Sequence, residues 1–341
     1  MAQQSVQQST LNVVMGAMTF GAEGKMQSRV HDLKDVEAIL HAFRAHGHTE
    51  IDTARLYGGG TSEEYLGKLD CKGLGLKLET KLYPFTMPAQ GGQPAMSVSH
   101  SPEDLRKHLM ISLKALNTDC LEMWYLHGPD RRTPYEVTMK AVNDLYKEGH
   151  FKRFGISNFM SWEVAEIVGI CKANGYIQPT VYQGIYNAIH RGVEPELFPC
   201  LHKFGIAFYE FNPLAGGLLT GQHKSLDGDV EHGSRFDANT MQGKSYRQRY
   251  WNQLHFEALA AIGKVADAHS LTMTEVALRW VSHHSLMKRE SGDSVIIGAS
   301  SLKHIEQNLV DLEKGPLPQA VVNALDEAWE KVKAASSPYF H

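Results

Sequence analysis

The chain has 341 residues, enough for two ordinary domains or one large barrel, and 43% of them are apolar, which predicts a globular protein with a sizeable core. Its 34 lysines and arginines against 38 aspartates and glutamates give a formal net charge of −4 at pH 7. No basic excess therefore points to nucleic acid or an anionic membrane as a partner. No apolar run approaches the roughly 20 residues that are needed to span a bilayer.

The first ten residues are polar and rich in Gln and Ser, without the apolar stretch of a secretory signal or the basic cluster of a transit peptide. We therefore expect a polar N-terminal tail over residues 1–10. The four cysteines, Cys71, Cys120, Cys171 and Cys200, are far apart and form no Cys-x-x-Cys pair. Buried reduced thiols are the simplest interpretation, and they suit a cytoplasmic protein.

From residue 11 onward, short β-branched or apolar runs alternate with longer amphipathic segments. The runs predict eight strands, at residues 11–15, up to 52, up to about 81, 120–126, 152–156, 180–183, 206–211 and 294–297. The amphipathic segments predict helices at residues 32–45, from 61 or 62, from 101, 134–149, 162–173, 195–204, 256–269, 273–283, 302–309 and 321–333. Strands that are each followed by a helix, with no long polar linker, favour a single α/β domain over residues 11–341. The predicted fold is a (β/α)8 TIM barrel with an extra C-terminal helix.

Two segments stand out within this alternation. Ser101 is followed by Pro102 and two acidic residues, which is a favoured helix start, and the helix would bury a leucine stripe at Leu105, Leu109, Leu113 and Leu116. The alternation breaks over residues 212–251, which are rich in Gly, Asp, Gln, Lys and Arg. A loop of that length inside a compact domain is usually functional or partly disordered, so we expect a long irregular loop after the seventh strand.

The turn after the first strand argues against two nucleotide-binding folds. It reads Gly16-Ala17-Met18-Thr19-Phe20-Gly21, which is not the Gly-x-Gly-x-x-Gly turn of a dinucleotide-binding fold. No Lys-Ser or Lys-Thr pair follows it, so it is not a P-loop either. We exclude both folds on these grounds.

Four polar residues fall at the carboxyl ends of predicted strands or one short loop beyond them: Asp52, Tyr57, Lys81 and His127. In a parallel barrel this edge is where catalytic groups converge. A tyrosine has an ordinary pKa of about 10 and is a poor acid, but a neighbouring ammonium lowers that pKa. Lys81, kept charged by Asp52, could do so for Tyr57, and His127 could orient a substrate oxygen. The set suits delivery of a proton to a carbonyl oxygen, although each residue alone also fits an ordinary core, surface or helix-capping role.

Several motifs resemble the aldo-keto reductases across essentially the whole length. They are the segment 16–21, Asp52-Thr53-Ala54 with Tyr57 and Gly58, Gly155-Ile156-Ser157-Asn158-Phe159, and the segment 212–221. Arg279-Trp280 with His283-His284, and the ending Pro338-Tyr339-Phe340, are similar to the aflatoxin-aldehyde and succinic-semialdehyde reductase branch, family 7.

The resemblance implies an NADPH-dependent carbonyl reductase in which Tyr57 is the proton donor, Lys81 and Asp52 tune it, and His127 orients the carbonyl. It implies that Ser157, Asn158 and Gln183 hold the nicotinamide carboxamide and that Phe211 stacks on its ring. The implied cofactor contacts also include Met18, Thr19, Asp52, Asn212, Pro213, Leu214, Gly216, Gly217, Leu218, Thr220, Gly221, Gln222, Gly298, Ser300, Gln307 and Asn308. Glycines in the 212–222 segment would let backbone amides approach the pyrophosphate. Arg235 is at the position of a cation for the 2′-phosphate of NADPH, and a planar guanidinium suits phosphate well.

The resemblance places Tyr246 and Arg249 against the substrate. The chain departs from the branch in having His304 where a glutamine is common and His341 where an arginine is usual at the end. The second change would weaken attraction for acidic aldehydes. His46, His48, His283 and His284 have no carboxylate or cysteine companions at ligand spacing, so we expect no metal.

Two functions remain open on the sequence. The first is reduction of small-molecule aldehydes such as dicarbonyls, semialdehydes and aromatic aldehydes. The alternative is a cofactor-binding regulatory or sensor subunit similar to the potassium-channel β subunits, which also retain the four polar residues. Related reductases of this branch are often dimers, so the resemblance allows a homodimer, although no residue pattern marks an interface.

Overall fold

The computed structural model describes residues 9–87 and 96–341. Nearly all of the expected polar tail over residues 1–10 lies outside this part, so the tail and the boundary at residue 11 stay predictions. No helix within the described residues is long and apolar enough to cross a membrane.

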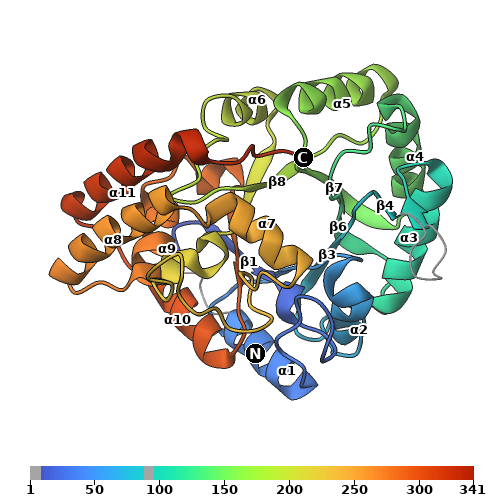
Figure 1. The fold of residues 1–341 in the computed structure, drawn as a ribbon. Coiled ribbons are helices and arrows are strands. Elements are labelled where there is room, and N and C mark those ends of the chain that lie inside the picture. Colours follow the sequence, from blue (N-terminus) through green and yellow to red (C-terminus); the bar gives the residue numbers. More distant parts are fainter. Residues whose placement is uncertain (1–8, 88–95) are drawn as a thin grey trace.

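Eight parallel strands close into a barrel in the order β1-β10-β9-β8-β7-β6-β3-β2, which confirms the predicted TIM-barrel fold. Figure 1 shows the helices arranged as a ring around these strands. The barrel strands are β1 (Asn12–Gly16), β2 (Glu50–Asp52), β3 (Lys77–Leu82), β6 (Leu121–Leu126), β7 (Phe151–Ser157), β8 (Val181–Ile185), β9 (Ala207–Phe211) and β10 (Ser294–Gly298). Pairing of β1 with both β10 and β2 closes the sheet.

The helices follow the strands as the amphipathic pattern predicts. They are α1 (Leu33–Ala45), α2 (Thr61–Gly67), α3 (Pro102–Ala115), α4 (Tyr135–Lys147), α5 (Ser161–Asn174), α6 (Leu197–Phe204), α7 (Met241–Tyr250), α8 (Gln253–Ala268), α9 (Met273–His283), α10 (Leu302–Glu313) and α11 (Gln319–Val332). Asp32 caps α1 by accepting a 2.8 Å hydrogen bond from the Lys34 amide, and Ser101 caps α3 in the same way through the Asp104 amide. The expected stripe on α3 is buried.

Two regions differ from the sequence prediction. A two-stranded antiparallel sheet, β4 (Phe85–Met87) with β5 (Met96–Val98), follows β3. Its strands have three residues each, too few to produce a hydrophobic period. The segment 212–251, expected to be irregular, contains η3 (Ala215–Thr220) and ends in helix α7. α7 buries only Gly243 and Tyr250, so it has no apolar stripe by which a sequence could reveal it.

Side chains along each barrel strand point alternately outward and inward, which divides the buried apolar residues into two clusters. Outward-facing side chains pack with the helices in the main core, while a smaller set fills the barrel interior: Val14, Met123, Tyr125, Val181, Ala207, Tyr209 and Ile296. The C-terminal segment leaves α11 and returns to α5, where the Ser161 amide donates to Tyr339 Oη at 3.1 Å (Figure 1). The chain therefore ends beside the carboxyl ends of the barrel strands.

All four cysteines are free thiols. Cys71 and Cys171 are buried, and burial raises the pKa of each to about 11, so both stay protonated at neutral pH. Cys200 is half-buried and Cys120 is exposed, so the prediction of buried thiols is wrong for Cys120, which lies at the turn before β6.

Candidate active site

A buried ion pair lies at the carboxyl ends of β2 and β3. Lys81 Nζ donates to both carboxylate oxygens of Asp52, at 2.5 and 2.6 Å, and to the Thr53 carbonyl at 2.8 Å. Gln183 on β8 adds a 2.8 Å bond from its amide nitrogen to Asp52 Oδ1. Burial lowers the pKa of Lys81, and the charge of Asp52 opposes that shift. The pair is thus held from three strands, with every ammonium hydrogen in use.

Tyr57 lies against this pair. It begins η2 (Tyr57–Gly60), where Gly58 and Gly59 have φ of 57° and 63°, a backbone shape that favours glycine. The turn brings the Tyr57 ring to 5.0 Å from Lys81 Nζ, measured to the ring centroid. The ammonium therefore faces the ring, while its hydrogens point to Asp52 and Thr53.

The charge state of Tyr57 differs from the expectation. Burial raises the pKa of the Tyr57 phenol well above its ordinary value, and the negative charge of Asp52 adds to the shift. The net shift is therefore upward, opposite to the lowering expected from a neighbouring ammonium, because burial dominates and the charge of Asp52 adds to it. The consequence is a phenol that remains protonated at neutral pH.

His127 follows β6 and completes the group. Its ring lies edge-on to Tyr57, with centroids 5.8 Å apart, and edge-on to Tyr83 at 5.4 Å. Burial, followed by the charge of Lys81, holds the pKa of His127 well below its ordinary value, so the imidazole is neutral. Its Nδ1 is buried and has no hydrogen-bond partner among the described residues. The structure thus brings the four residues together; their catalytic roles stay predictions.

The residues expected at the nicotinamide occupy the next stretch of the rim, at the ends of β7, β8 and β9. Asn158 has φ of 67° and donates from Nδ2 to the His127 carbonyl at 2.8 Å and to Ser157 Oγ at 3.0 Å. Gln183 uses its amide N–H on Asp52, which ties this stretch to the ion pair. Phe211 ends β9 and is half-buried. The predicted carboxamide positions Asn158 and Gln183 therefore contact the central residues His127 and Asp52.

The segment after β9 contains several residues with left-handed backbone. Asn212, Ala215, Gly216 and Gly217 have φ of 70°, 50°, 72° and 105°. A Cβ on Gly216 would lie 2.4 Å from the ring of Tyr246, so only glycine fits there. Asn212 Nδ2 is buried without a partner among the described residues, while Tyr246 Oη donates to Asn212 Oδ1 at 3.0 Å. A run of left-handed residues with an unpaired buried amide fits an anionic cofactor. Pro213, Leu214, Leu218, Thr220, Gly221 and Gln222 belong to the same segment.

The residues expected at the adenosine half gather around the start of α10. Ser300 Oγ lies 2.9 Å from His304 Nδ1, Gln307 donates to Asp311, and Asn308 Nδ2 donates to the Gly298 carbonyl at 3.5 Å. The imidazole of His304, which replaces the glutamine common in the branch, is thus hydrogen-bonded to the Ser300 hydroxyl. In η1 (Ala17–Thr19), Thr19 Oγ1 donates to the Ala299 carbonyl at 2.6 Å, and Met18 Sδ lies 4.0 Å from Gln242 Nε2.

Arg235 connects this region with the centre of the rim. Its guanidinium lies 5.9 Å from the Tyr246 ring centroid, and a Cβ on Gly298 would be 3.8 Å from one of its nitrogens. It also acts on Tyr57 by lowering the pKa of the phenol, against the larger effect of burial. The position fits a cation for a cofactor phosphate, although its specific contact with a 2′-phosphate stays a prediction.

Arg249, which the sequence places against the substrate, lies beside the end of the chain. Arg249 Nε donates to Ser337 Oγ at 3.3 Å, and its guanidinium lies 5.8 Å from the Tyr246 ring centroid. The His341 amide donates to the Asn158 carbonyl at 3.2 Å, and its Nδ1 lies 3.1 Å from Tyr83 Oη. Tyr83 was missed by the sequence reasoning, although its place two residues after Lys81 on the same rim could have suggested it.

Three of the four histidines of the two pairs have hydrogen bonds, whereas neither ring nitrogen of the buried His48 has a partner among the described residues. His46 bonds Glu313 at 2.6 Å, His283 bonds the Lys314 carbonyl at 2.6 Å, and His284 accepts from the Leu317 amide at 2.9 Å. In the described part of the chain, no three His, Cys, Asp or Glu side chains come together in a way that could hold a metal ion. That the protein uses no metal stays a prediction.

Comparison with known proteins agrees with this geometry. Residues 12–330 match the model of the aldo/keto reductase family. Aldo-keto reductase family 7 member A3 of Homo sapiens is 45% identical over 339 residues, covering 96% of this chain and 96% of that protein. Aflatoxin B1 aldehyde reductase member 2 of Homo sapiens is 44% identical over 339 residues, covering 96% of this chain and 89% of that protein.

A solved structure shares the fold. Glycerol dehydrogenase AKR11B4 from Gluconobacter oxydans has a TM-score of 0.72 and 20% identity, covering 99% of this chain and 98% of that one. At this identity the likeness concerns the fold alone. The relatives confirm the resemblance to the aflatoxin-aldehyde branch, and the family match spans nearly the whole barrel. The chain therefore belongs to the aldo/keto reductase family of oxidoreductases.

Proposed function

We propose that this enzyme reduces aldehydes to alcohols with NADPH, and that Tyr57 donates the proton. The observation that carries the proposal is the arrangement at the rim: a protonated phenol and a neutral imidazole with a free Nδ1 lie beside a buried ammonium–carboxylate pair. The name of the human relative, an aflatoxin B1 aldehyde reductase, supports an aldehyde as substrate.

The residues act in a simple order. A carbonyl oxygen seated between the Tyr57 phenol and the His127 imidazole is oriented by both rings, which stand edge-on to each other. Ser157, Asn158, Gln183 and Phe211 would hold a reduced nicotinamide, which would supply the hydride for the carbonyl carbon when bound. The oxygen then becomes strongly basic and takes the Tyr57 proton, although the pKa of that phenol is raised, because an alkoxide is the stronger base. The phenolate that remains lies next to the Lys81 ammonium, which stabilises it.

The cofactor half of the proposal rests on the residues around this centre. Ser157, Asn158 and Gln183 would hold the carboxamide, Phe211 would stack on the ring, and backbone amides of residues 212–222 would bind the pyrophosphate. The start of α10, with Gly298, Ser300, Gln307 and Asn308, would close over the adenosine. Preference for NADPH over NADH is assigned to Arg235.

An assay of the purified protein tests this function. We expect loss of NADPH absorbance with 4-nitrobenzaldehyde, 2-carboxybenzaldehyde, succinic semialdehyde and dicarbonyl compounds, at rates that depend strongly on the aldehyde. Rates should be higher for uncharged aldehydes than for acidic ones, because His341 provides no fixed positive charge. A slow rate that is the same for every aldehyde would contradict catalysis and favour the sensor alternative. A cytoplasmic location and a homodimer belong to the same proposal.

The assignment of Arg235 gives a second test. Arg235→Ala should raise the Kd for NADPH by about 10- to 100-fold, the effect of losing a charged hydrogen bond to phosphate, and leave the Kd for NADH nearly unchanged. Lys244→Ala, which removes an exposed cation of α7, is the matched control and should alter neither constant. Equal losses for both cofactors in Arg235→Ala would show that Arg235 does not read the 2′-phosphate.

A further inference from the structure

The barrel interior contains a column of acids below the site. Glu50 and Asp52 begin and end β2, and Glu79 on β3 is the register partner of Asp52. In parallel barrels the interior is ordinarily filled by branched apolar side chains. Here the wall formed by β2 and β3 carries carboxyl groups from the lower end of the barrel up to Lys81.

Glu79 is the middle member of this column and plays no part in the mechanism above. It is fully buried, and its Oε2 accepts a 3.0 Å hydrogen bond from Tyr125 Oη. Burial raises the pKa of Glu79 well above its ordinary value, and the charges of Glu50 and Asp52 add to the shift, while Arg153 opposes it. This shift favours the protonated form of Glu79, which is the strand neighbour of Asp52 and so lies beside the Asp52–Lys81 pair.

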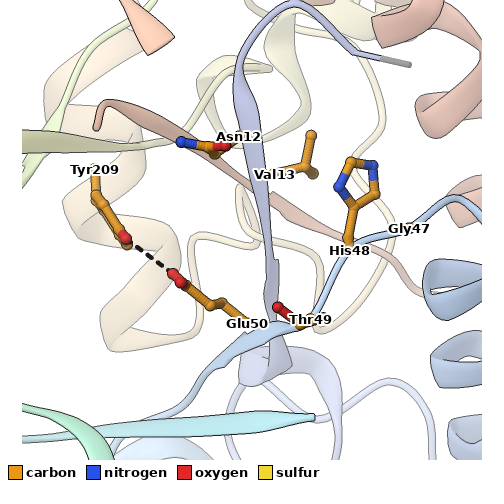
Figure 2. Close-up of a pocket in the computed structure, with 7 residues that line it drawn as sticks. All are labelled: Asn12, Val13, Gly47, His48, Thr49, Glu50 and Tyr209. Atoms are coloured by element: carbon orange, nitrogen blue, oxygen red, sulfur yellow. Dashed lines mark hydrogen bonds between the residues drawn. The ribbon is translucent and has the colours of Figure 1, made fainter. Parts of the chain in front are cut away.

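The lower end of the column meets a hollow. Figure 2 shows this hollow, lined by Asn12, Val13, Gly47, His48, Thr49, Glu50 and Tyr209, with Glu50 bonded to Tyr209. Its volume is about 140 Å³, which is room for a few water molecules. Glu50 accepts from Tyr209 Oη at 2.8 Å and lies 3.9 Å from a nitrogen of Arg153. Solvent can thus reach the lowest acid of the column.

At the upper end of the column, Lys81 has no comparable access to solvent. Its three N–H groups all bond to Asp52 and Thr53, and the side chains of Lys81 and Asp52 are 0% and 4% exposed. A substrate between Tyr57 and His127 would cover the phenol as well. While a substrate covers the site, a proton lost from Lys81 can therefore be replaced from inside the barrel.

We propose that Glu79 is a proton reserve for the site, resupplied from the hollow through Glu50. Tyr57 loses its O–H proton to the substrate oxyanion. The Lys81 ammonium, 5.0 Å from the Tyr57 ring centroid, then turns one N–H from its present partners to the phenolate and restores the phenol. The Glu79 proton passes by way of the Asp52 carboxylate to the Lys81 amine, and a proton from water in the hollow restores Glu79. The sum is one proton taken from solution for each carbonyl reduced. The inference rests on the proposed function, which supplies the hydride.

Stopped-flow measurement of two signals tests the reserve. NADPH absorbance reports hydride transfer, and an indicator dye in weak buffer reports proton uptake. In Glu79→Gln we expect hydride transfer in the first turnover to stay close to the wild-type rate, because Tyr57 and Lys81 already carry their protons. Proton uptake and all later turnovers should be at least about tenfold slower, within the usual range for removal of a proton-transfer group.

Glu210→Gln is the matched control. Glu210 is equally buried, but it alternates with Tyr209 on β9 and so faces the helices, away from the column. Its variant should leave both signals unchanged. Glu79→Asp keeps an acid and should recover uptake. Glu50→Gln should slow uptake as Glu79→Gln does, and it tests the route even where Glu79→Gln fails to fold.

The possible results distinguish a failure of the proton reserve from a failure of the proposed function. Uptake in Glu79→Gln as fast as in Glu210→Gln would overturn the reserve. Equal slowing of the first hydride transfer and of uptake would also overturn it, because that result means Glu79 only supports the shape of the site. A wild-type enzyme that oxidises no NADPH would instead refute the proposed function, which the aldehyde assay detects by itself.

Discussion

Tyr57→Phe is expected to lower kcat/KM for aldehydes by about 10²- to 10⁴-fold, the usual loss when a general acid is removed. The Kd for NADPH should change little, because the phenyl ring keeps the packing against Lys81 and only the hydroxyl is lost. Steady-state rates together with fluorescence titration of NADPH measure both quantities. A near-normal rate in this variant would show that another group gives the proton.

Tyr83→Phe is the control for that experiment. Tyr83 is the other phenol next to His127, and its hydroxyl bonds the His341 imidazole. If Tyr57 is the acid, removing the Tyr83 hydroxyl should alter the rate only a few-fold. A larger loss in Tyr83→Phe than in Tyr57→Phe would move the assignment to Tyr83. The pH dependence of the rate offers a further check. Because the pKa of Tyr57 is raised, the phenol should keep its proton, and the enzyme its activity, until well above pH 10.

The regular part of the fold could be predicted because each strand and helix carries its own period. The amphipathic segment 32–45 has an apolar stripe and an N-cap residue in its sequence, and the structure has helix α1 there. α7 escaped prediction because its ten residues are polar on all sides and are held by the Thr240 cap and by contacts of Tyr246 and Tyr250. Tertiary contacts of this kind leave no periodic signal in a sequence.

The central residues could be predicted for a different reason. Asp52, Lys81 and His127 each end a strand or follow one, and barrel closure alone brings such positions to one rim. The pKa shifts at the site could not be predicted from the sequence. The pKa of Tyr57 depends on burial and on the charge of Asp52, and neither effect can be read before the side chains are placed. Glu79 likewise looks like an ordinary alternating polar residue until the register puts it beside Asp52.

Lys81→Met should have the second large effect, because it separates a buried pair. Methionine fills much of the same volume, but among the described residues it leaves the Asp52 carboxylate with only the Gln183 amide as hydrogen-bond donor. Removing one partner of a buried ion pair typically costs about 3–5 kcal/mol of stability. We therefore expect a marked fall in the urea midpoint of unfolding. Turnover should also fall by about 10²-fold or more, because the Tyr57 phenolate loses its stabilising charge.

A double substitution separates the structural part of this loss from the chemical part. When Asp52→Asn is combined with Lys81→Met, the pair leaves no buried charge behind, and the introduced amide oxygen can still accept from Gln183. Most of the lost free energy of unfolding should return, since replacing a whole buried ion pair by uncharged groups often changes stability little. Activity should stay low, because no ammonium lies beside Tyr57. Recovery of activity together with stability would mean that Lys81 acts only by holding the fold, and that the phenol needs no neighbouring positive charge to give up its proton.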